Sequence, residues 1–315
     1  MSLPPLLVLA GPTATGKTGL SIAVARRLRD EGVTAEIISA DSRQVYRGLD
    51  IGTAKAPAEA RAGIPHQGLD LVEPDEPFSV IDFVRHARGA LEAIAERRGL
   101  AILVGGTGLY LRAVARGLDA DALPFDREVR AAIEAGLDRD GLAPAVERLR
   151  ELAPRLASRI DLANPRRVAR ALEIAELRGD ALPPPPMGYS GPIAWLGLRA
   201  PAGAHREWIA NRAREQFDAG LIEEARTLRE RYDPTLPAFS AIGYREAWAV
   251  LDGEVTREEA IELDAKRNVD FAKRQATWFR SEPEIEWLDA TEDNVAPALA
   301  AARALYRAAG ASSSA

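Results

Sequence analysis

Three short apolar runs stand out in the first third of the chain. They are PLLVLA at residues 5–10, AEIISAD at residues 35–41 and LAILVGGTG at residues 100–108. Apolar runs of this length, rich in Leu, Ile and Val, are typical of strands that are buried on both faces of a parallel sheet. We therefore predict one strand in each run.

Helical periodicity follows the first two runs. Residues 17–30 place leucine and valine at four-residue spacing, and residues 78–99 form an amphipathic pattern with Ser79 as a candidate cap. Alternation of strand, turn and helix predicts an α/β fold, in which a parallel sheet carries helices on both faces.

The rest of the chain adds two more strand patterns and two helical blocks. IAWLGLRA (193–200) and IEWLDA (285–290) read as later strands of the same sheet, and four prolines at 183–186 form a stiff linker. We predict a first core part at 1–118, a helical insertion at 119–190, a core strand at 191–204, a helical segment at 205–280, and a last strand, C-terminal helix and disordered tail at 281–315.

Composition narrows the classes of site and compartment. The 315 residues include no cysteine and three histidines, which excludes disulfides and disfavours a zinc site built by the protein. No apolar stretch approaches the ~20 residues that span a bilayer, and the N-terminus lacks a basic region typical of a signal peptide. We expect a cytoplasmic protein with no membrane partner.

The net charge bears on nucleic-acid binding. Taken alone, the formal charge of −6 argues against a nucleic-acid partner. Salt screens surface charge beyond about 8 Å, however, so local basic patches matter more than the total.

The segment GPTATGKT matches the phosphate-binding pattern G-x-x-x-x-G-K-[ST] between a predicted strand and a predicted helix. Backbone amides and the helix N-terminus attract an anion, the lysine adds a full charge, and the last hydroxyl can hold Mg²⁺. The sequence therefore predicts a site for a di- or triphosphate, with Thr18 as the metal ligand. The loop residues are Gly11, Pro12, Thr13, Ala14, Thr15, Gly16, Lys17 and Thr18.

The loop alone does not say whether the phosphates react or leave. A nucleotide hydrolase usually has an apolar strand ending in a magnesium-binding aspartate. Here the third strand runs into Thr107, and the carboxylate follows the second strand, at Asp41. We expect Asp41 to lie where a second substrate meets the phosphate-bearing one, as a base would in a kinase acting on a hydroxyl.

Seven segments together resemble the tRNA dimethylallyltransferase family, in family order and over most of the chain. They are GPTATGKT (11–18), DSRQVYRGLDIGTAK (41–55), PHQGLDLVEP (65–74), LVGGTGLYLRA (103–113), NPRRVARALEI (164–174), SAIGYRE (240–246) and KRQATWFR (273–280).

The resemblance implies a P-loop NTPase-like core with a helical insertion and a specific reaction. Such enzymes move a dimethylallyl group from its diphosphate to the exocyclic amine of the tRNA adenosine next to the anticodon on its 3′ side. The loop would then hold a Mg²⁺-bound diphosphate leaving group. We expect the enzyme to act as a monomer on the anticodon stem-loop.

The resemblance also assigns catalytic roles, each with a plainer alternative. Asp41 would accept the amine proton, or merely cap a turn or orient Lys17 or Mg²⁺. Arg212 would clamp the diphosphate, or lie solvated on a helix. Thr107 would contact the target adenosine, or be only a helix cap.

Positions that match tRNA-contact segments are spread over the chain. Basic and aromatic residues interleave in two predicted helices, a pattern that suits RNA, although charged helix faces are more often simply solvated. His66 lies in the PHQ motif, and we interpret it as a packed or capping histidine. The expected tRNA contacts are Asp41, Ser42, Arg43, Gln44, Thr107, Arg130, Arg166, Arg167, Arg170, Gly243, Tyr244, Arg245, Lys273, Arg274, Gln275, Trp278 and Arg280.

Two other functions remain open from the sequence. A P-loop kinase for a small hydroxylated metabolite would share the loop and Asp41, but it would not need basic, aromatic helices far along the chain. A non-catalytic RNA-binding module would not need an intact Lys17, Thr18 and Asp41.

Overall fold

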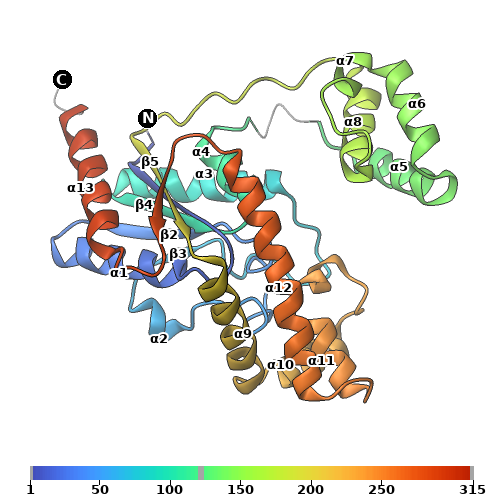
Figure 1. Cartoon of the computed structure of the whole chain (residues 1–315). Coiled ribbons are helices and arrows are strands. Elements are labelled where there is room, and N and C mark those ends of the chain that lie inside the picture. Colours follow the sequence, from blue (N-terminus) through green and yellow to red (C-terminus); the bar gives the residue numbers. More distant parts are fainter. Residues whose placement is uncertain (1–2, 120–123, 313–315) are drawn as a thin grey trace. The chain divides into compact units, whose positions relative to one another are not determined.

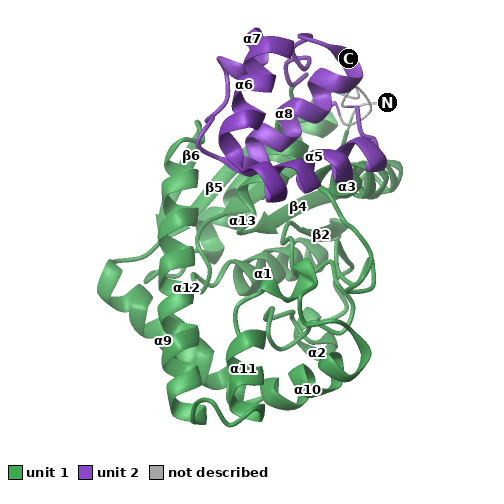
Figure 2. Ribbon diagram, turned by 90° about the vertical axis from the view of Figure 1, so that its right-hand side faces the viewer, with its two compact units in different colours: residues 1–117, 188–315 green, residues 118–187 purple. Residues whose placement is uncertain are grey.

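The computed structural model describes residues 3–119 and 124–312 (Figure 1). Residues 1–117 and 188–315 form one compact unit, and residues 118–187 form a second (Figure 2). None of the helices in the described part of the chain is long and apolar enough to cross a membrane.

The first unit is built on a six-stranded, wholly parallel sheet, which confirms the predicted α/β core. Its strand order is β3–β2–β4–β1–β5–β6. The strands are β1 (Leu6–Ala10), β2 (Ala35–Ser39), β3 (His66–Gln67), β4 (Leu100–Gly105), β5 (Ile193–Arg199) and β6 (Ile285–Asp289). Strand β3 was not predicted, because two residues are too few to show any periodicity.

Helices cover both faces of this sheet (Figure 1). Helices α1 (Lys17–Asp30) and α13 (Val295–Ser312) pack together over one face, where Leu7, Leu9 and Leu28 join the same apolar cluster. Helices α3 (Val80–Glu96) and α4 (Gly108–Ala115) pack together against β4, and Ser79 caps α3 as predicted. A four-residue helix, α2 (Ala58–Arg61), lies between β2 and β3.

The C-terminal tail differs in part from the expected disorder. The tail expected to be disordered is GASSSA (310–315), but residues 310–312 belong to α13, so the prediction is wrong for them. They extend a long alanine-rich helix whose earlier turns pack on the sheet, and adding residues to an existing helix is easier than starting one. Residues 313–315 lie outside the described part of the chain.

The block at 205–280 is helical, as predicted. It contains α9 (Ala202–Asp218), α10 (Leu221–Arg231), the short 3₁₀ helix η1 (Pro237–Ser240), α11 (Tyr244–Leu251) and the long α12 (Arg257–Arg280). Helices α9 and α12 pack side by side. Both therefore belong to the unit that carries the phosphate-binding loop.

The second unit has its own apolar core. It contains α5 (Arg127–Asp140), α6 (Leu142–Leu152), α7 (Pro154–Ala157) and α8 (Pro165–Arg178). Asn164 caps α8, accepting hydrogen bonds from the backbone N–H groups of Arg166 and Arg167, with Pro165 in the first position. Local sequence signals therefore define where this helix begins.

Candidate active site

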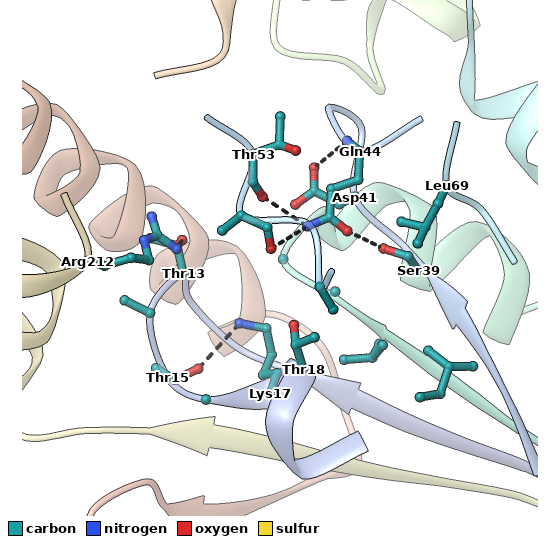
Figure 3. A pocket seen from close by; sticks show the side chains of 18 of the residues that line it. Thr13, Thr15, Lys17, Thr18, Ser39, Asp41, Gln44, Thr53, Leu69 and Arg212 are labelled. Atoms are coloured by element: carbon teal, nitrogen blue, oxygen red, sulfur yellow. Dashed lines mark hydrogen bonds between the residues drawn. The ribbon is translucent and has the colours of Figure 1, made fainter. Parts of the chain in front are cut away.

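A cavity of about 270 Å³ opens at the carboxyl ends of β1, β2 and β4 (Figure 3). This is the edge at which parallel sheets bind their ligands. The phosphate-binding loop lies on one side, and Asp41 lies on the other. The cavity is lined by Thr13, Ala14, Thr15, Gly16, Lys17, Thr18, Ile37, Ser39, Asp41, Gln44, Thr53, Ala54, Ala56, His66, Leu69, Val104, Gly105, Gly106, Arg212, Phe271 and Gln275.

Lys17 is a buried cation that no carboxylate of the described residues contacts. Its Nζ donates to the carbonyl oxygen of Pro12 (2.5 Å) and to Oγ1 of Thr15 (3.3 Å). Burial, and then the positive charge of Arg212, lower the pKa of Lys17 to about 7, while Asp41 acts in the opposite direction. An anion bound in the loop would stabilise the charged form.

Helices α9 and α12 hold the loop through a single residue, Thr13. His205 Nε2 lies 2.7 Å from the Thr13 carbonyl oxygen, and Arg212 donates to the Thr13 hydroxyl (2.5 Å). The Thr13 N–H donates to Gln275 Oε1 (2.8 Å), and Gln275 Nε2 donates to the Gly106 carbonyl oxygen (2.9 Å). The first three contacts tie the distant helical block to the phosphate-binding loop, and the fourth ties it to the residue after β4.

Asp41 lines the cavity, as predicted, and it also caps a turn, which was the alternative interpretation. Its Oδ1 accepts a hydrogen bond from the Arg43 N–H (2.8 Å), so one oxygen does cap the turn. No described residue donates a hydrogen bond to its other oxygen, and the residue lines the cavity. One carboxylate oxygen is therefore available to a ligand.

Thr107 precedes α4, but its side chain does not cap that helix. Its Oγ1 instead accepts a hydrogen bond from the Ser42 N–H (3.0 Å). The hydroxyl thus holds the residue next to Asp41 in place, which neither the cap nor the adenosine-contact interpretation foresaw. A contact with substrate remains a prediction.

The loop that carries Asp41 is held by its own side chains. Gln44 accepts from the Ser39 hydroxyl (2.8 Å) and donates to the Thr53 carbonyl oxygen (2.9 Å). Arg43 donates to the Pro237 carbonyl oxygen (2.9 Å) in η1. These two expected tRNA contacts already have protein partners, and they shape the cavity wall.

Tyr244 corrects one expectation. It is fully buried, and its hydroxyl donates to Glu224 (2.7 Å), so it presents no surface to tRNA. Burial and the negative charge of Glu224 raise the pKa of Tyr244 above its usual range. A side chain on Gly52 would collide with the Tyr244 ring, which explains the glycine there. The sequence does not reveal this packing, because Gly52 and Glu224 come from other parts of the chain.

Glu224 was missed by the sequence analysis. Besides Tyr244, it accepts hydrogen bonds from the backbone N–H groups of Asp50 (3.2 Å), Ile51 (2.8 Å) and Gly52 (3.1 Å). The carboxylate therefore anchors the loop between β2 and β3 to α10. Gly243 next to this cluster is buried, whereas Arg245 is exposed with no side-chain partner among the described residues.

The end of α12 divides its expected RNA contacts into exposed and packed residues. Trp278 packs against Gly108 of α4, and the Arg112 guanidinium lies 4.2 Å from its ring centroid. Gln275 is buried, as described above. Both residues are used in packing within the unit, but Gln275 also lines the main cavity and Trp278 is only half-buried, so a contact with tRNA remains a prediction for each. Exposed positions on the same helix are Lys273, Arg274 and Arg280.

The arginines of the second unit likewise divide into residues with a carboxylate partner and exposed residues. Arg130 (2.9 Å) and Arg170 (2.6 Å) both pair with the fully buried carboxylate of Glu173. Arg166 and Arg167 are exposed, and no described residue contacts their side chains. All except Arg130 line a cavity of about 530 Å³ with an apolar floor that includes Leu156 and Ile174. We therefore interpret Arg130 and Arg170 as residues that stabilise the fold of the second unit.

His66 lines the main cavity without an assigned role. Its Nδ1 lies 2.8 Å from the Ile64 carbonyl oxygen, and its Nε2 is buried without a partner among the described residues. Burial is the main cause that lowers the pKa of His66. The packed-histidine interpretation is consistent with this arrangement.

The residues around the cavity suit a hard cation that arrives with phosphate. The described residues contain no group of three or more His, Cys, Asp or Glu side chains that could hold a metal by themselves. Thr18 and Asp41 offer only oxygen ligands, and both line the cavity. Mg²⁺ prefers this donor set, completed by substrate phosphates and water.

Comparisons with known proteins agree with one another. A sequence model of the IPP transferase family matches residues 44–282. The tRNA dimethylallyltransferase of Geobacillus kaustophilus is 41% identical over 289 residues, which cover 90% of each chain.

Solved structures resemble the fold as well. The full-length tRNA isopentenylpyrophosphate transferase from Bacillus halodurans aligns with a TM-score of 0.67 and 37% identity, covering 96% of this chain and 99% of that one. A eukaryotic dimethylallyltransferase acting on tRNA aligns with a TM-score of 0.76 and 26% identity, covering 96% and 77%.

Proposed function

The chain belongs to the IPP transferase family of tRNA dimethylallyltransferases, and from that premise we propose its reaction in detail. It transfers a dimethylallyl group from dimethylallyl diphosphate to the exocyclic amine of the adenosine on the 3′ side of the anticodon in tRNA. The observation that supports this assignment most is one cavity lined by Lys17, Arg212 and Asp41. It places cations for a diphosphate opposite a carboxylate for a nucleophile.

The diphosphate is held at the phosphate-binding loop. Backbone amides at the start of α1, the Lys17 ammonium and the Arg212 guanidinium supply donors and positive charge. Thr18 is the residue that would hold Mg²⁺ carried by the diphosphate, and the ion would neutralise part of its charge. As the allylic C–O bond breaks, its electron pair and the negative charge pass to the diphosphate.

Asp41 acts at the other end of the cavity. The amine nitrogen forms the new C–N bond, and the amine proton passes to the Asp41 oxygen that has no internal donor. The hydrogen bond from the Arg43 N–H to the other oxygen keeps the carboxylate oriented. Thr107 supports this position by holding the Ser42 N–H.

The tRNA must present an unstacked base to this cavity. We propose that exposed cations supply its phosphate contacts, whereas the packed residues shape the site. We expect a monomer to be active, in the compartment where tRNA resides, the cytoplasm. The proposed exposed contacts are Arg166, Arg167, Arg245, Lys273, Arg274 and Arg280.

Label transfer tests the proposal. The protein is incubated with Mg²⁺, unmodified tRNA and dimethylallyl diphosphate labelled in its carbon chain, and a parallel reaction contains ATP labelled in its terminal phosphate. We expect carbon label in the tRNA and no consumption of ATP. ATP consumption with unlabelled tRNA would instead indicate a kinase.

Asp41→Asn then tests the base. We expect turnover to fall by about 10²–10⁴-fold, with the affinity for tRNA changed by no more than a few-fold. An equal loss of turnover and tRNA affinity would contradict the role of Asp41 as a base. Asp30→Asn, the same change at the exposed last residue of α1, is the matched control, and we expect wild-type turnover and affinity.

A further inference from the structure

Arg212 is a largely enclosed cation without an ion pair. Its two side-chain hydrogen bonds go to the Thr13 hydroxyl (2.5 Å) and to Oδ1 of Asn268 (3.0 Å). Within residues 3–119 and 124–312, no carboxylate lies within ion-pair distance of its guanidinium, and its Nε is buried without an acceptor. Buried charges are usually paired, so this arrangement leaves the charge of Arg212 available to a ligand.

Asn268 is the only described side chain on α12 that forms a hydrogen bond with this guanidinium. It is 5% exposed, and its Nδ2 donates to the carboxylate (2.8 Å) and to the backbone carbonyl oxygen (3.2 Å) of Asp264. A carboxylate only accepts hydrogen bonds, and a guanidinium only donates them. Both contacts are therefore satisfied in one orientation of the Asn268 amide and in neither after a flip.

Asp264 accepts a hydrogen bond from this amide and forms no ion pair with Arg212. It is 1% exposed and faces charges from three helices, namely Arg212 on α9, Glu246 on α11 and Arg267 on its own helix. Arg267 pairs with Glu246. Burial, assisted by Glu246, raises the pKa of Asp264 to about 6, against the effects of Asn268 and the two arginines. The amide thus separates a buried carboxylate from the cation.

We propose that Asn268, oriented by Asp264, is a positioning residue that aims Arg212 at the diphosphate without neutralising it. A direct carboxylate partner would hold the guanidinium equally well but would compete with the diphosphate for it. The amide supplies a neutral acceptor on one side, and the Thr13 hydroxyl supplies another. This inference rests on the proposed role of Arg212 as a diphosphate ligand.

Binding of inorganic pyrophosphate with Mg²⁺, measured by calorimetry on the full chain, tests the inference. Asn268→Leu removes the acceptor at similar volume, and we expect about tenfold weaker binding, the size of one lost hydrogen bond to a charged group. In transfer assays we expect kcat to fall while the KM for tRNA stays unchanged. The control is Asn211→Leu, the same change at an exposed position of α9, with wild-type affinity expected.

Asp264 provides a second pair of variants in case Asn268→Leu does not fold. Asp264→Leu frees the amide to flip, and we expect binding several-fold weaker than wild type. Asp264→Asn keeps an acceptor for Asn268 and should bind within about twofold of wild type, by the same hydrogen-bond argument. If Asp264→Asn were as weak as Asp264→Leu, the orientation argument would be wrong.

The decisive measurement repeats Asn268→Leu in an Arg212→Ala background. If Asn268 acts through Arg212, the second substitution should weaken pyrophosphate binding no further. Additive losses, or wild-type binding by Asn268→Leu alone, would overturn the inference. A wild-type protein that binds pyrophosphate but prenylates no tRNA would overturn the proposed function instead, while this binding series would still decide the role of Asn268.

Discussion

The two units treat partly buried arginines in opposite ways. In the second unit, Arg130 and Arg170 converge on the buried carboxylate of Glu173. In the first unit, among the described residues, Arg212 donates hydrogen bonds only to the Thr13 hydroxyl and the Asn268 amide oxygen. The buried carboxylate of Asp264 binds the same amide and forms no ion pair with Arg212. An arginine paired with a buried acid stabilises the fold, whereas one held by neutral acceptors keeps its charge for a ligand.

The largest effect should come from breaking the pairs in the second unit. Glu173→Leu leaves two partly buried cations without their shared partner, and we expect the free energy of unfolding to fall by about 3–5 kcal/mol. Chemical denaturation of the full chain measures this change. Glu134→Gln, which removes only the exposed partner of Arg130, should cost less than about 1 kcal/mol. Equal losses would show that burial of Glu173 does not matter.

Arg212→Ala should have the next largest effect, on catalysis. Loss of a donor aimed at the developing negative charge is expected to lower kcat by about 10²–10³-fold. Steady-state transfer kinetics measure it, and tRNA affinity should be unchanged. The matched control is Arg130→Ala, which leaves Glu173 paired with Arg170 and should change kcat by no more than about twofold. A comparable fall in both variants would remove the distinction between the two kinds of arginine.

A smaller effect is expected for exposed arginines. Arg167→Ala and Arg274→Ala should each weaken tRNA binding and reduce the slope of log Kd against log salt, by up to about 0.7–0.9 for each phosphate that the side chain neutralises in the wild-type complex. Filter binding at several salt concentrations measures the slope. Arg139→Ala, at an exposed arginine paired with Asp140, is the control. An unchanged slope would argue against a phosphate partner for the arginine concerned.

The smallest predicted effect concerns pH. Lys17 has a lowered pKa of about 7 in the free protein, so its amine is charged below that pH and loses the charge above it. Because a diphosphate binds the charged form, affinity should fall as the pH rises past about 7, and binding at pH 8 should take up as much as one proton. Calorimetry in buffers of different ionisation enthalpy measures that uptake.

Lys17→Arg separates this proton from those of the ligand. The guanidinium stays charged throughout the range, so uptake due to this site should disappear, and only titration of the diphosphate itself should remain. Uptake identical in both proteins would show that Lys17 is already charged in the free protein at pH 8.

Local patterns predicted much of the first unit. Apolar runs identified five of the six strands, and GPTATGKT identified a loop that lines the main cavity, because hydrophobic periodicity and glycine turns are properties of neighbouring residues. The end of the second strand also placed Asp41 at the cavity. The two-residue strand β3 escaped detection because it gains its conformation from pairing with Ile37 and Ile38.

Which side chains are exposed was harder to predict from the sequence than where the strands and the loop lie. Tyr244, Gln275 and Trp278 were expected to contact tRNA because they lie in segments that resemble the family, and for Trp278 also because aromatic residues interleave with basic ones in its helix. The structure uses all three in packing, against Gly52, the phosphate-binding loop and Gly108. Whether such a side chain is exposed depends on partners more than a hundred residues away, which a local pattern does not contain.

The strands of the sheet, the loop GPTATGKT and the carboxylate after the second strand could be derived from local sequence, since each depends on a few consecutive residues. Which cations are left without a carboxylate partner depends on the folded arrangement. Arg212, Arg130 and Arg170 look alike in the sequence, but Asn268 and Thr13 surround the first while Glu173 binds the other two. Charge becomes available or committed through the neighbours that folding brings together, and those neighbours come from distant parts of the chain.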